Sequence, residues 1–362
     1  LYSRIIHMYN HILNTQEQEC IDSFDKVIIW GFPLHTHTHS YIHAMWYKAF
    51  KEGFNKDTYW FHDKEYPDQD NFNYNNCLFI SEGYADYKIP ILDTSTYFIL
   101  NAINPSRYID KNARLIEIRF NVVEMHDINN DFNLNDGTHE NLIELTNNAR
   151  YEKLYSNKDL HSSKRDNKIT KMDYECIYLY WATDLLPHEI SYNDIQIKKD
   201  NSIYYLGSPG RSINYHLFKG ICESQGIKWL TNNPWVRPLS FEDNKNIMQK
   251  SLLCPDFRPI GTDTDTKELG IKNGKNHLEI GYLPCRVLKA ISYGQVGITD
   301  SIHVKTILKE HVLYDSDMNK LFIKAMENKN NISMIKASME YVKNNHTYIN
   351  RVHELVKALV QK

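Results

Sequence analysis

The chain has 362 residues, of which 42% are hydrophobic and 24% charged, and its 42 lysines and arginines against 45 aspartates and glutamates give a net charge of −3. This length favours two domains over a single core. The near-neutral charge excludes a polybasic nucleic-acid coat, so we expect no nucleic-acid partner. No apolar run reaches the roughly 18 residues that a membrane helix needs, which predicts no transmembrane segment.

The cysteines indicate a reducing compartment. Six are spread from residue 20 to residue 285, without a CxxC pair, and most lie in apolar runs. Such placement is typical of buried free thiols rather than of a disulfide scaffold. No basic end followed by an apolar centre marks a signal peptide. We therefore expect a cytoplasmic protein.

Short apolar runs alternate with amphipathic stretches over the first half of the chain. Several runs are continuous, as expected for strands buried on both faces of a parallel sheet. The strands are predicted at 26–32, 58–61, 77–83, 96–103, 114–123 and 175–183. A helix with one apolar face is predicted over 40–51 and ends at Gly53. This order predicts right-handed β-α-β units. The Asn-, Asp- and Lys-rich stretch 126–171 is predicted to form surface loops around a helix over 139–153.

A second alternating series begins near residue 200. Its strands are predicted within 202–210 and at 227–230, 252–257 and 296–301, and its helices at 213–226, 241–251 and 284–295. From Asp317 onward the chain is predicted to be helical. Two Rossmann-like domains that face each other across a cleft account best for this α/β layout. We place them at residues 1–190 and 191–332, and the final helix at 333–362.

The stretch 279–300 is the most informative for function. A turn leads into a helix that starts near Pro284, Gly294 ends this helix, and a short apolar strand follows. A helix N-terminus offers unpaired N–H groups and partial positive charge, which suit a pyrophosphate. Arg286 in the first turn can add its fork of donors. The alternative is an ordinary helix with Arg286 on a solvated face.

Residues 284–300, PCRVLKAISYGQVGITD, resemble the donor-binding segment of GT-B glycosyltransferases, particularly of group 1-like and CgeB-like enzymes. The stretch 341–359 also resembles the CgeB-like ending, with His-Thr-Tyr-x-x-Arg at 346–351. The resemblance covers about 200–362 and is only topological over 1–190. It implies a GT-B fold, with the nucleotide sugar bound by the C-terminal domain and the acceptor by the N-terminal one. It further implies that the final helix packs back on the N-terminal domain.

One position departs from this resemblance. Many relatives carry a Glu before the Ala of the helix, where it holds the donor ribose, and this chain has Lys289. A lysine can donate to a hydroxyl or a phosphate but cannot accept a hydrogen bond as a carboxylate does. Lys289 is therefore kept as a donor-binding candidate together with Pro284 and Arg286, and the nucleotide preference stays open.

A second donor-side candidate is the Gly-rich turn after the predicted strand at 202. Gly207 and Gly210 allow close approach of the backbone, and Arg211 can bind phosphate. A plain Pro-Gly turn with an exposed arginine is the alternative. Arg237 is a further cationic candidate for the donor.

A histidine-rich loop suggests the acceptor side. His35, His37 and His39 alternate after the first predicted strand, and His43 follows on the helix. This loop lies at the carboxyl end of the sheet, where open α/β sheets bind ligands. An inverting transfer needs a general base for the acceptor hydroxyl, and we assign this role to His37 or His39. His35 and His43 are assigned to acceptor binding. Zinc ligation and structural capping of the helix remain alternatives.

Two acidic residues are further candidates for the site. Glu82 follows a predicted strand and is assigned to acceptor binding or to a rival carboxylate base, while a solvated acid at a helix start is the alternative. Asp184, together with His188, lies near the predicted interdomain crevice, but a helix N-cap explains Asp184 equally well.

The function that these inferences favour is transfer of a sugar from a nucleotide diphosphate sugar to a glycan or other hydroxyl acceptor. Arg211, Arg286 and the helix start would stabilise the leaving diphosphate, so no essential metal and no tightly bound cofactor are expected. A UDP- or GDP-sugar is the expected co-substrate. Two alternatives stay open: a nucleotide-sugar epimerase of the same architecture, and a non-catalytic carbohydrate-binding module that kept the fold.

Overall fold

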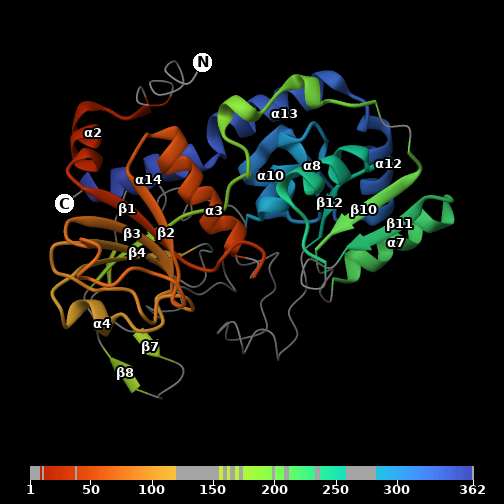
Figure 1. Ribbon diagram of the computed structural model, residues 1–362. Helices are drawn as coiled ribbons and strands as arrows, with labels where there is room; N and C mark the ends of the chain where they lie inside the picture. Colours follow the sequence, from red (N-terminus) through yellow and green to blue (C-terminus); the bar gives the residue numbers. More distant parts are fainter. Residues whose placement is uncertain are drawn as a thin grey trace.

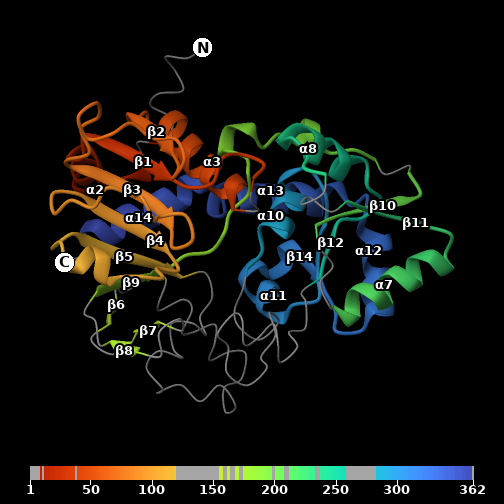
Figure 2. The ribbon, with the colours of Figure 1, turned by 60° about the horizontal axis from the view of Figure 1, so that its bottom comes forward.

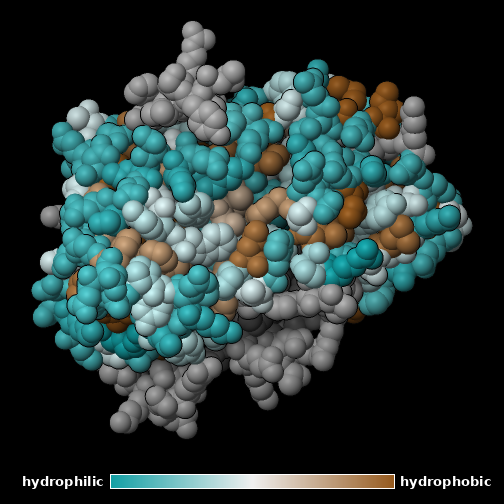
Figure 3. Space-filling view, in the orientation of Figure 1, coloured by the Kyte–Doolittle hydropathy of each residue, from teal (hydrophilic) through white to brown (hydrophobic). Residues whose placement is uncertain are grey.

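The structure is a computed structural model (Figure 1). It describes residues 9, 12–36, 39–119, 155–157, 161–163, 168–170, 174–197, 200–207, 212–232, 237–257 and 283–360. Within these residues no helix is both long enough and apolar enough to cross a bilayer. The visible face in Figure 3 is mostly hydrophilic, with apolar patches concentrated over the half that carries the second set of strands.

The first half of the chain builds a seven-stranded sheet, whose strands are stacked one below the other on the left of Figure 2. In spatial order they are β2 (Thr58–Phe61), β1 (Lys26–Trp30), β3 (Cys77–Glu82), β4 (Thr96–Leu100), β5 (Arg114–Arg119), β9 (Tyr174–Tyr178) and β6 (Tyr155–Asn157). All neighbouring pairs are parallel except β9 and β6. The predicted α/β class with a Rossmann-like parallel sheet is thereby confirmed.

The continuous apolar strands bury both of their faces, as their sequence predicts. Val27 and Ile29 of β1 point into one core, while Ile28 and Trp30 point into another on the opposite face. Helices α2 (Thr15–Asp22), α3 (Ser40–Lys48) and α14 (Tyr348–Val360) cover the first face. Short α4 (Ser106–Ile109) and irregular segments cover the second. Helix α3 does not run unbroken to Gly53, because its last turn is a π-helix over Ala49–Gly53.

The Asn-rich stretch contains strands that its sequence did not predict. Besides β6, a hairpin forms from β7 (His161–Ser163) and β8 (Lys168–Thr170). These strands are short and polar, so the hydrophobic patterning that predicts buried strands gives no signal for them. The predicted helix at 139–153 lies outside the described residues.

The second half of the chain carries a further set of parallel strands (Figure 2). Strand β10 (Ser202–Leu206) pairs with β11 (Lys228–Asn232), and β13 (Gly297–Thr299) lies between β12 (Pro255–Asp256) and β14 (Val312–Tyr314). The Leu252 amide donates to the Ser202 carbonyl at 2.8 Å and so links the two groups. Around them lie α7 (Ile213–Ser224), α8 (Phe241–Lys250), α10 (Cys285–Ser292), α11 (Ile302–Leu308) and α12 (Met318–Asn328).

The predicted single helix over 333–362 is wrong, because the chain forms two helices there. Helix α13 (Ile332–Asn345) packs in one core with α10, and α14 packs in the core of the first sheet, where it lies in blue among red and orange elements in Figure 1. The break falls at His346 and Thr347. The side-chain oxygen of Asn350, in the first turn of α14, reaches back and accepts hydrogen bonds from the amide and the hydroxyl of Thr347, like the back-reaching side chain of a capping box.

Candidate functional site

A histidine–glutamate pair lies at the carboxyl edge of the first sheet. Glu82 is the last residue of β3 and is buried, while His39 stands at the N-cap position of α3. The Nδ1 atom of His39 is 2.5 Å from Oε2 of Glu82, and the His39 side chain is 30% exposed. A buried carboxylate that engages one ring nitrogen fixes the orientation of the imidazole and stabilises its protonated form. The pair can therefore act on a proton at the exposed edge.

His43 belongs to the support of this pair. It is buried, and its Nδ1 accepts a hydrogen bond from the Phe32 amide at 3.1 Å, so its Nε2 carries the proton. This Nε2 lies 3.9 Å from Oε2 of Glu82. A Cβ at Gly31 would stand 2.1 Å from Nδ1 of His43, so only glycine leaves room for the ring. The void of about 10 Å³ beside His43 is at the lower limit for one water.

The first turn of α3 also contacts the second half of the chain. Tyr41 donates to the Leu239 carbonyl at 3.2 Å, and its ring meets that of Phe241 edge to face. His35 is 3.0 Å from the Tyr41 hydroxyl through Nδ1, and its own φ is 68°. The structure therefore places His35 beside Tyr41, two residues along the chain from His39.

Two of the donor-side candidates lie against each other at the carboxyl end of β10. Gly207 has a φ of 114°, and a Cβ there would be 2.2 Å from Nη2 of Arg286. The Arg286 guanidinium donates to the Tyr205 hydroxyl at 2.6 Å and lies over the Tyr205 ring, 4.6 Å from its centre. Its Nη1 is 3.4 Å from Oδ1 of the fully buried Asp256. Arg286 is thus held on β10 and β12, with its cation paired to a carboxylate.

Helix α10 starts where its sequence predicts. Pro284 occupies the N-cap position, and no side chain caps the helix there. The first N–H groups of α10 and the Arg286 side chain of its first turn are therefore on the same end of the helix.

Lys289 lies one turn further along α10 than Arg286 and forms a buried cluster. Its Nζ is 2.9 Å from Oδ2 of Asp184, and Asp184 also accepts a hydrogen bond from the Tyr293 hydroxyl at 2.5 Å. Burial lowers the pKa of the Lys289 ammonium, but the Asp184 carboxylate and weaker neighbours outweigh it, so the pKa is raised from 10.5. Burial and then Asp184 raise the pKa of Tyr293 well above 10.0. Lys289 also lies 5.9 Å from the ring centre of Tyr41.

The structure differs from several interpretations of the sequence. Asp184 is not a helix N-cap, since the next helical turn begins at Pro187. Glu82 is not a solvated acid at a helix start, because it ends β3 and is buried. Asp86, four residues further along the chain, is buried as well and accepts from the Tyr108 hydroxyl at 2.6 Å. Arg237 is exposed, and its carbonyl accepts a hydrogen bond from the Asn232 amide group. His37, Gly210 and Arg211 lie outside the described residues.

Several residues in and around these clusters were not among the sequence candidates, among them Asp256, Tyr205 and Trp181. Asp256 is the next-to-last residue of the run LLCPDF, and an acid near the end of a predicted strand could have marked it. The sequence around Tyr205 and Trp181 is typical of ordinary core aromatics. The His39 and Trp181 rings lie 5.9 Å apart, which only the folded chain reveals.

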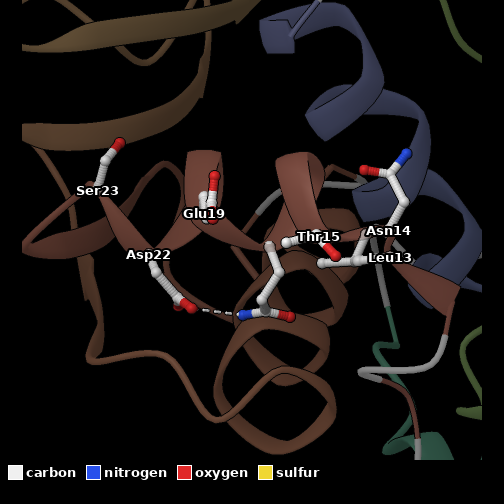
Figure 4. A pocket seen from close by; sticks show the side chains of 7 residues that line it. Leu13, Asn14, Thr15, Glu19, Asp22 and Ser23 are labelled. Atoms are coloured by element: carbon white, nitrogen blue, oxygen red, sulfur yellow. Dashed lines mark hydrogen bonds between the residues drawn. The ribbon is translucent and has the colours of Figure 1, made fainter.

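A separate open depression of about 590 Å³ runs along α2 (Figure 4). It is lined by Leu13, Asn14, Thr15, Gln18, Glu19, Asp22 and Ser23. The Gln18 amide donates to Asp22 at 2.7 Å within it. The depression shares no residue with the clusters above. Among the described residues, no group of three or more His, Cys, Asp or Glu side chains could hold a metal ion.

The chain is thus an α/β protein with a Rossmann-like parallel sheet, with polar clusters at the sheet's carboxyl edge and at the start of α10. No protein-family model, no curated protein and no solved structure matches it.

Proposed function

We propose that the chain is a glycosyltransferase that moves a sugar from a nucleotide diphosphate sugar to a hydroxyl acceptor. The observation that carries the proposal is the contact between His39 and the buried Glu82 at the carboxyl edge of the first sheet. In the proposed reaction, His39 takes the proton of the acceptor hydroxyl. Glu82 holds the ring and stabilises the imidazolium that forms.

The donor diphosphate is assigned to the start of α10 and the carboxyl end of β10. Support comes from the close approach of Gly207 to Arg286 and from the N–H groups of the first turn of α10. A negative leaving group gains from a helix N-terminus and a guanidinium without a metal ion. A UDP- or GDP-sugar remains the proposed co-substrate.

The proposed arrangement is a GT-B one, with acceptor and donor in a cleft between two Rossmann-like domains. The contacts of Tyr41 with Leu239 and Phe241 support it, because they bring the turn that carries His39 next to the second half. Closure of such a cleft would exclude water and protect the donor from hydrolysis.

A second candidate is a carbohydrate-binding module without transferase activity. The ion pairs of Arg286 with Asp256 and of Lys289 with Asp184 favour it, because they occupy the cations that a diphosphate would use. In a transferase, Arg286 has to bind the donor diphosphate either together with Asp256 or in place of it.

The test is thermal stabilisation by UDP, GDP, dTDP, ADP and CMP, with and without magnesium. A nucleotide at 100 times its dissociation constant stabilises by about 2.7 kcal/mol. One diphosphate that stands out, followed by turnover of the matching sugar nucleotide, is the expected result. No shift with any nucleotide at millimolar concentration would contradict the donor site and favour the binding module.

A further inference from the structure

An acid at the end of a strand in the second half lies beside the proposed donor site. Strand β13 ends at Thr299, and Asp300 follows it directly. In the parallel register of β12 with β13, Asp256 lies beside Thr299. Because neighbouring strands are about 4.8 Å apart, Asp256 and Asp300 share one carboxyl edge. Asp256 is in turn 3.4 Å from Arg286.

The first turn of α7 holds the Asp300 side chain. The Nδ2 atom of Asn214 donates to Oδ2 of Asp300 at 3.0 Å. Asp300 is 5% exposed, and Asn214 is half-buried. The carboxylate is therefore fixed in place and largely removed from water, which strengthens a further hydrogen bond that it accepts from a ligand.

A series of contacts on α7 and β10 also links this acid to Arg286. Asn214 is followed on α7 by Tyr215, whose ring centre lies 4.8 Å from that of Tyr205. The Tyr205 hydroxyl accepts a hydrogen bond from Arg286 at 2.6 Å. Arg286 and Asp300 therefore lie on one rim, which the carboxyl ends of β10, β12 and β13 form together with the first turns of α7 and α10.

This rim carries both kinds of group that a nucleoside diphosphate requires. The guanidinium of Arg286 and the start of α10 suit the diphosphate. A ribose presents two neighbouring hydroxyls, and an ionised carboxylate can accept a hydrogen bond from each. Lys289 cannot accept such bonds, and its ammonium is paired with Asp184. Asp300 is an acceptor at the carboxyl edge, where open α/β sheets bind ligands.

We infer that Asp300 accepts hydrogen bonds from the ribose hydroxyls of the donor nucleotide, so that the chain selects a ribonucleotide over its 2′-deoxy counterpart. This inference rests on the proposed function, which assigns the diphosphate to Arg286 and the start of α10 but assigns no residue to the ribose. A 2′-deoxynucleotide gives up one of these hydrogen bonds. A site that is built to bond a hydroxyl rejects the analogue that lacks it.

The experiment is isothermal titration calorimetry on the full chain with two matched pairs, UDP with 2′-deoxy-UDP and GDP with 2′-deoxy-GDP. Within a pair the base and the diphosphate are the same, so the ratio of affinities reports on the hydroxyl alone. We expect the ribonucleotide of at least one pair to bind about tenfold more tightly than its deoxy counterpart. Asp300→Asn should remove this preference and leave the affinity for the deoxynucleotide unchanged.

Three variants separate recognition from structural support. Asparagine keeps the shape of the side chain and can still accept from Asn214, so Asp300→Asn should leave the thermal transition nearly unchanged. Asn214→Ala keeps the carboxylate but loses its tether, and should reduce the preference in part. Asp315→Asn is the matched control, because Asp315 follows the neighbouring strand β14 but pairs with Lys324 at 2.8 Å. This control should keep the full preference for the ribonucleotide.

The outcomes separate this inference from the function on which it rests. Equal affinities within both pairs, or a preference that survives in Asp300→Asn, would overturn the role of Asp300 and leave the donor site standing. No binding of any of the four nucleotides would contradict the donor site and the role of Asp300 together. A preference that Asp300→Asn removes, in a chain that transfers no sugar from UDP- or GDP-sugars, would reject the transferase and leave the ribose site standing.

Discussion

Lys289 Nζ lies 2.9 Å from Oδ2 of Asp184, and this pair ties α10 to the segment that follows β9. Asp184 is also bonded to Tyr293, one helical turn further along α10. Both ends of the ion pair are largely buried, at 16% and 2% exposed. Lys289, a donor-binding candidate from the sequence, thus takes part in a contact between the two halves of the chain.

Removal of the Lys289 cation should destabilise the fold. Lys289→Met leaves the Asp184 carboxylate buried without its counter-charge, and we expect a loss of about 3 kcal/mol in the free energy of unfolding. The double variant with Asp184→Asn should recover part of this loss. Urea denaturation measures both. Lys245→Met is the matched control, because Lys245 pairs with Asp194 at 2.8 Å in a more exposed setting and should cost less than about 1 kcal/mol. Equal losses in the two variants would contradict a special role for Lys289.

The same cluster predicts a decline of stability at alkaline pH. The pKa values of Lys289 and Tyr293 are both raised in the folded chain, so the folded state holds these protons more tightly than the unfolded state. Their contribution to the free energy of unfolding is complete below the ordinary pKa values of 10.0 and 10.5. This contribution is lost as the pH rises through the raised pKa values of the folded chain. Urea midpoints between neutral pH and about pH 11 measure the decline. Tyr293→Phe combined with Lys289→Met should flatten it, and an unchanged slope would place the titration elsewhere.

The His39–Glu82 pair should control turnover and not donor binding. Glu82→Gln keeps the shape of the side chain but removes the charge that stabilises the imidazolium, so we expect kcat to fall about a hundredfold. His39→Ala should have a similar effect, and the thermal shift caused by the nucleotide should remain in both variants. Glu65→Gln is the matched control, since Glu65 is 89% exposed and lies 3.5 Å from His62. Retained turnover in Glu82→Gln would contradict the role of the His39–Glu82 pair and leave His37 as the candidate base.

Arg286 should be required for the nucleotide-induced shift. Arg286→Ala removes the guanidinium at the start of α10, and the shift measured against the variant's own transition should disappear. Because the variant removes a cation from beside the buried Asp256, Arg286→Lys is made in parallel to keep a cation there. Lys320→Ala on α12 is the control, because it removes an exposed cation that was never assigned to the donor site. A full shift in Arg286→Ala would exclude this end of α10 as the diphosphate site.

The parallel sheet was predictable because its strands are continuous apolar runs. In β1 and β3, consecutive residues point into cores on opposite faces of the sheet. A continuous apolar run is typical of a strand that is buried on both of its faces. The polar strands β6, β7 and β8 were not predictable, since backbone pairing rather than an apolar face defines them. The break between α13 and α14 was missed because a helical pattern continues across it, while the capping by Asn350 and the two separate cores are tertiary facts.

The site was predictable as separate candidates and not as pairs. His39 and Glu82 were both singled out, but their contact depends on the register of β1 with β3, in which Trp30 lies beside Ser81. Gly207 and Arg286 were likewise selected from different motifs, and their contact depends on how α10 packs on β10. The partners Asp184 and Asp256 come from segments without periodic pattern. Hydrophobic periodicity gives no information on such contacts.

Arg351 should be a main determinant of stability at the junction between the halves. Its fully buried guanidinium donates to the carbonyls of Tyr180 and Trp181, at 2.7 and 3.0 Å. It also bonds the Asn345 carbonyl at 3.3 Å and the Glu354 carboxylate at 3.2 Å. The first two carbonyls belong to the segment that leaves the first sheet, and the third ends α13. One side chain thus satisfies the acceptors of three chain segments where they meet.

A lysine cannot replace this fork, because its single ammonium reaches fewer of these acceptors at once. Arg351→Lys should therefore leave at least one buried carbonyl unsatisfied and reduce the free energy of unfolding by about 2 kcal/mol. Arg351→Met should reduce it further, since Glu354 then loses its counter-charge as well. Lys357→Met on the same helix is the control, and as an exposed position it should change stability by less than about 0.5 kcal/mol. Urea denaturation compares the three variants. A loss in Arg351→Lys no larger than that in the control would mean that the fork of hydrogen bonds does not hold the junction together.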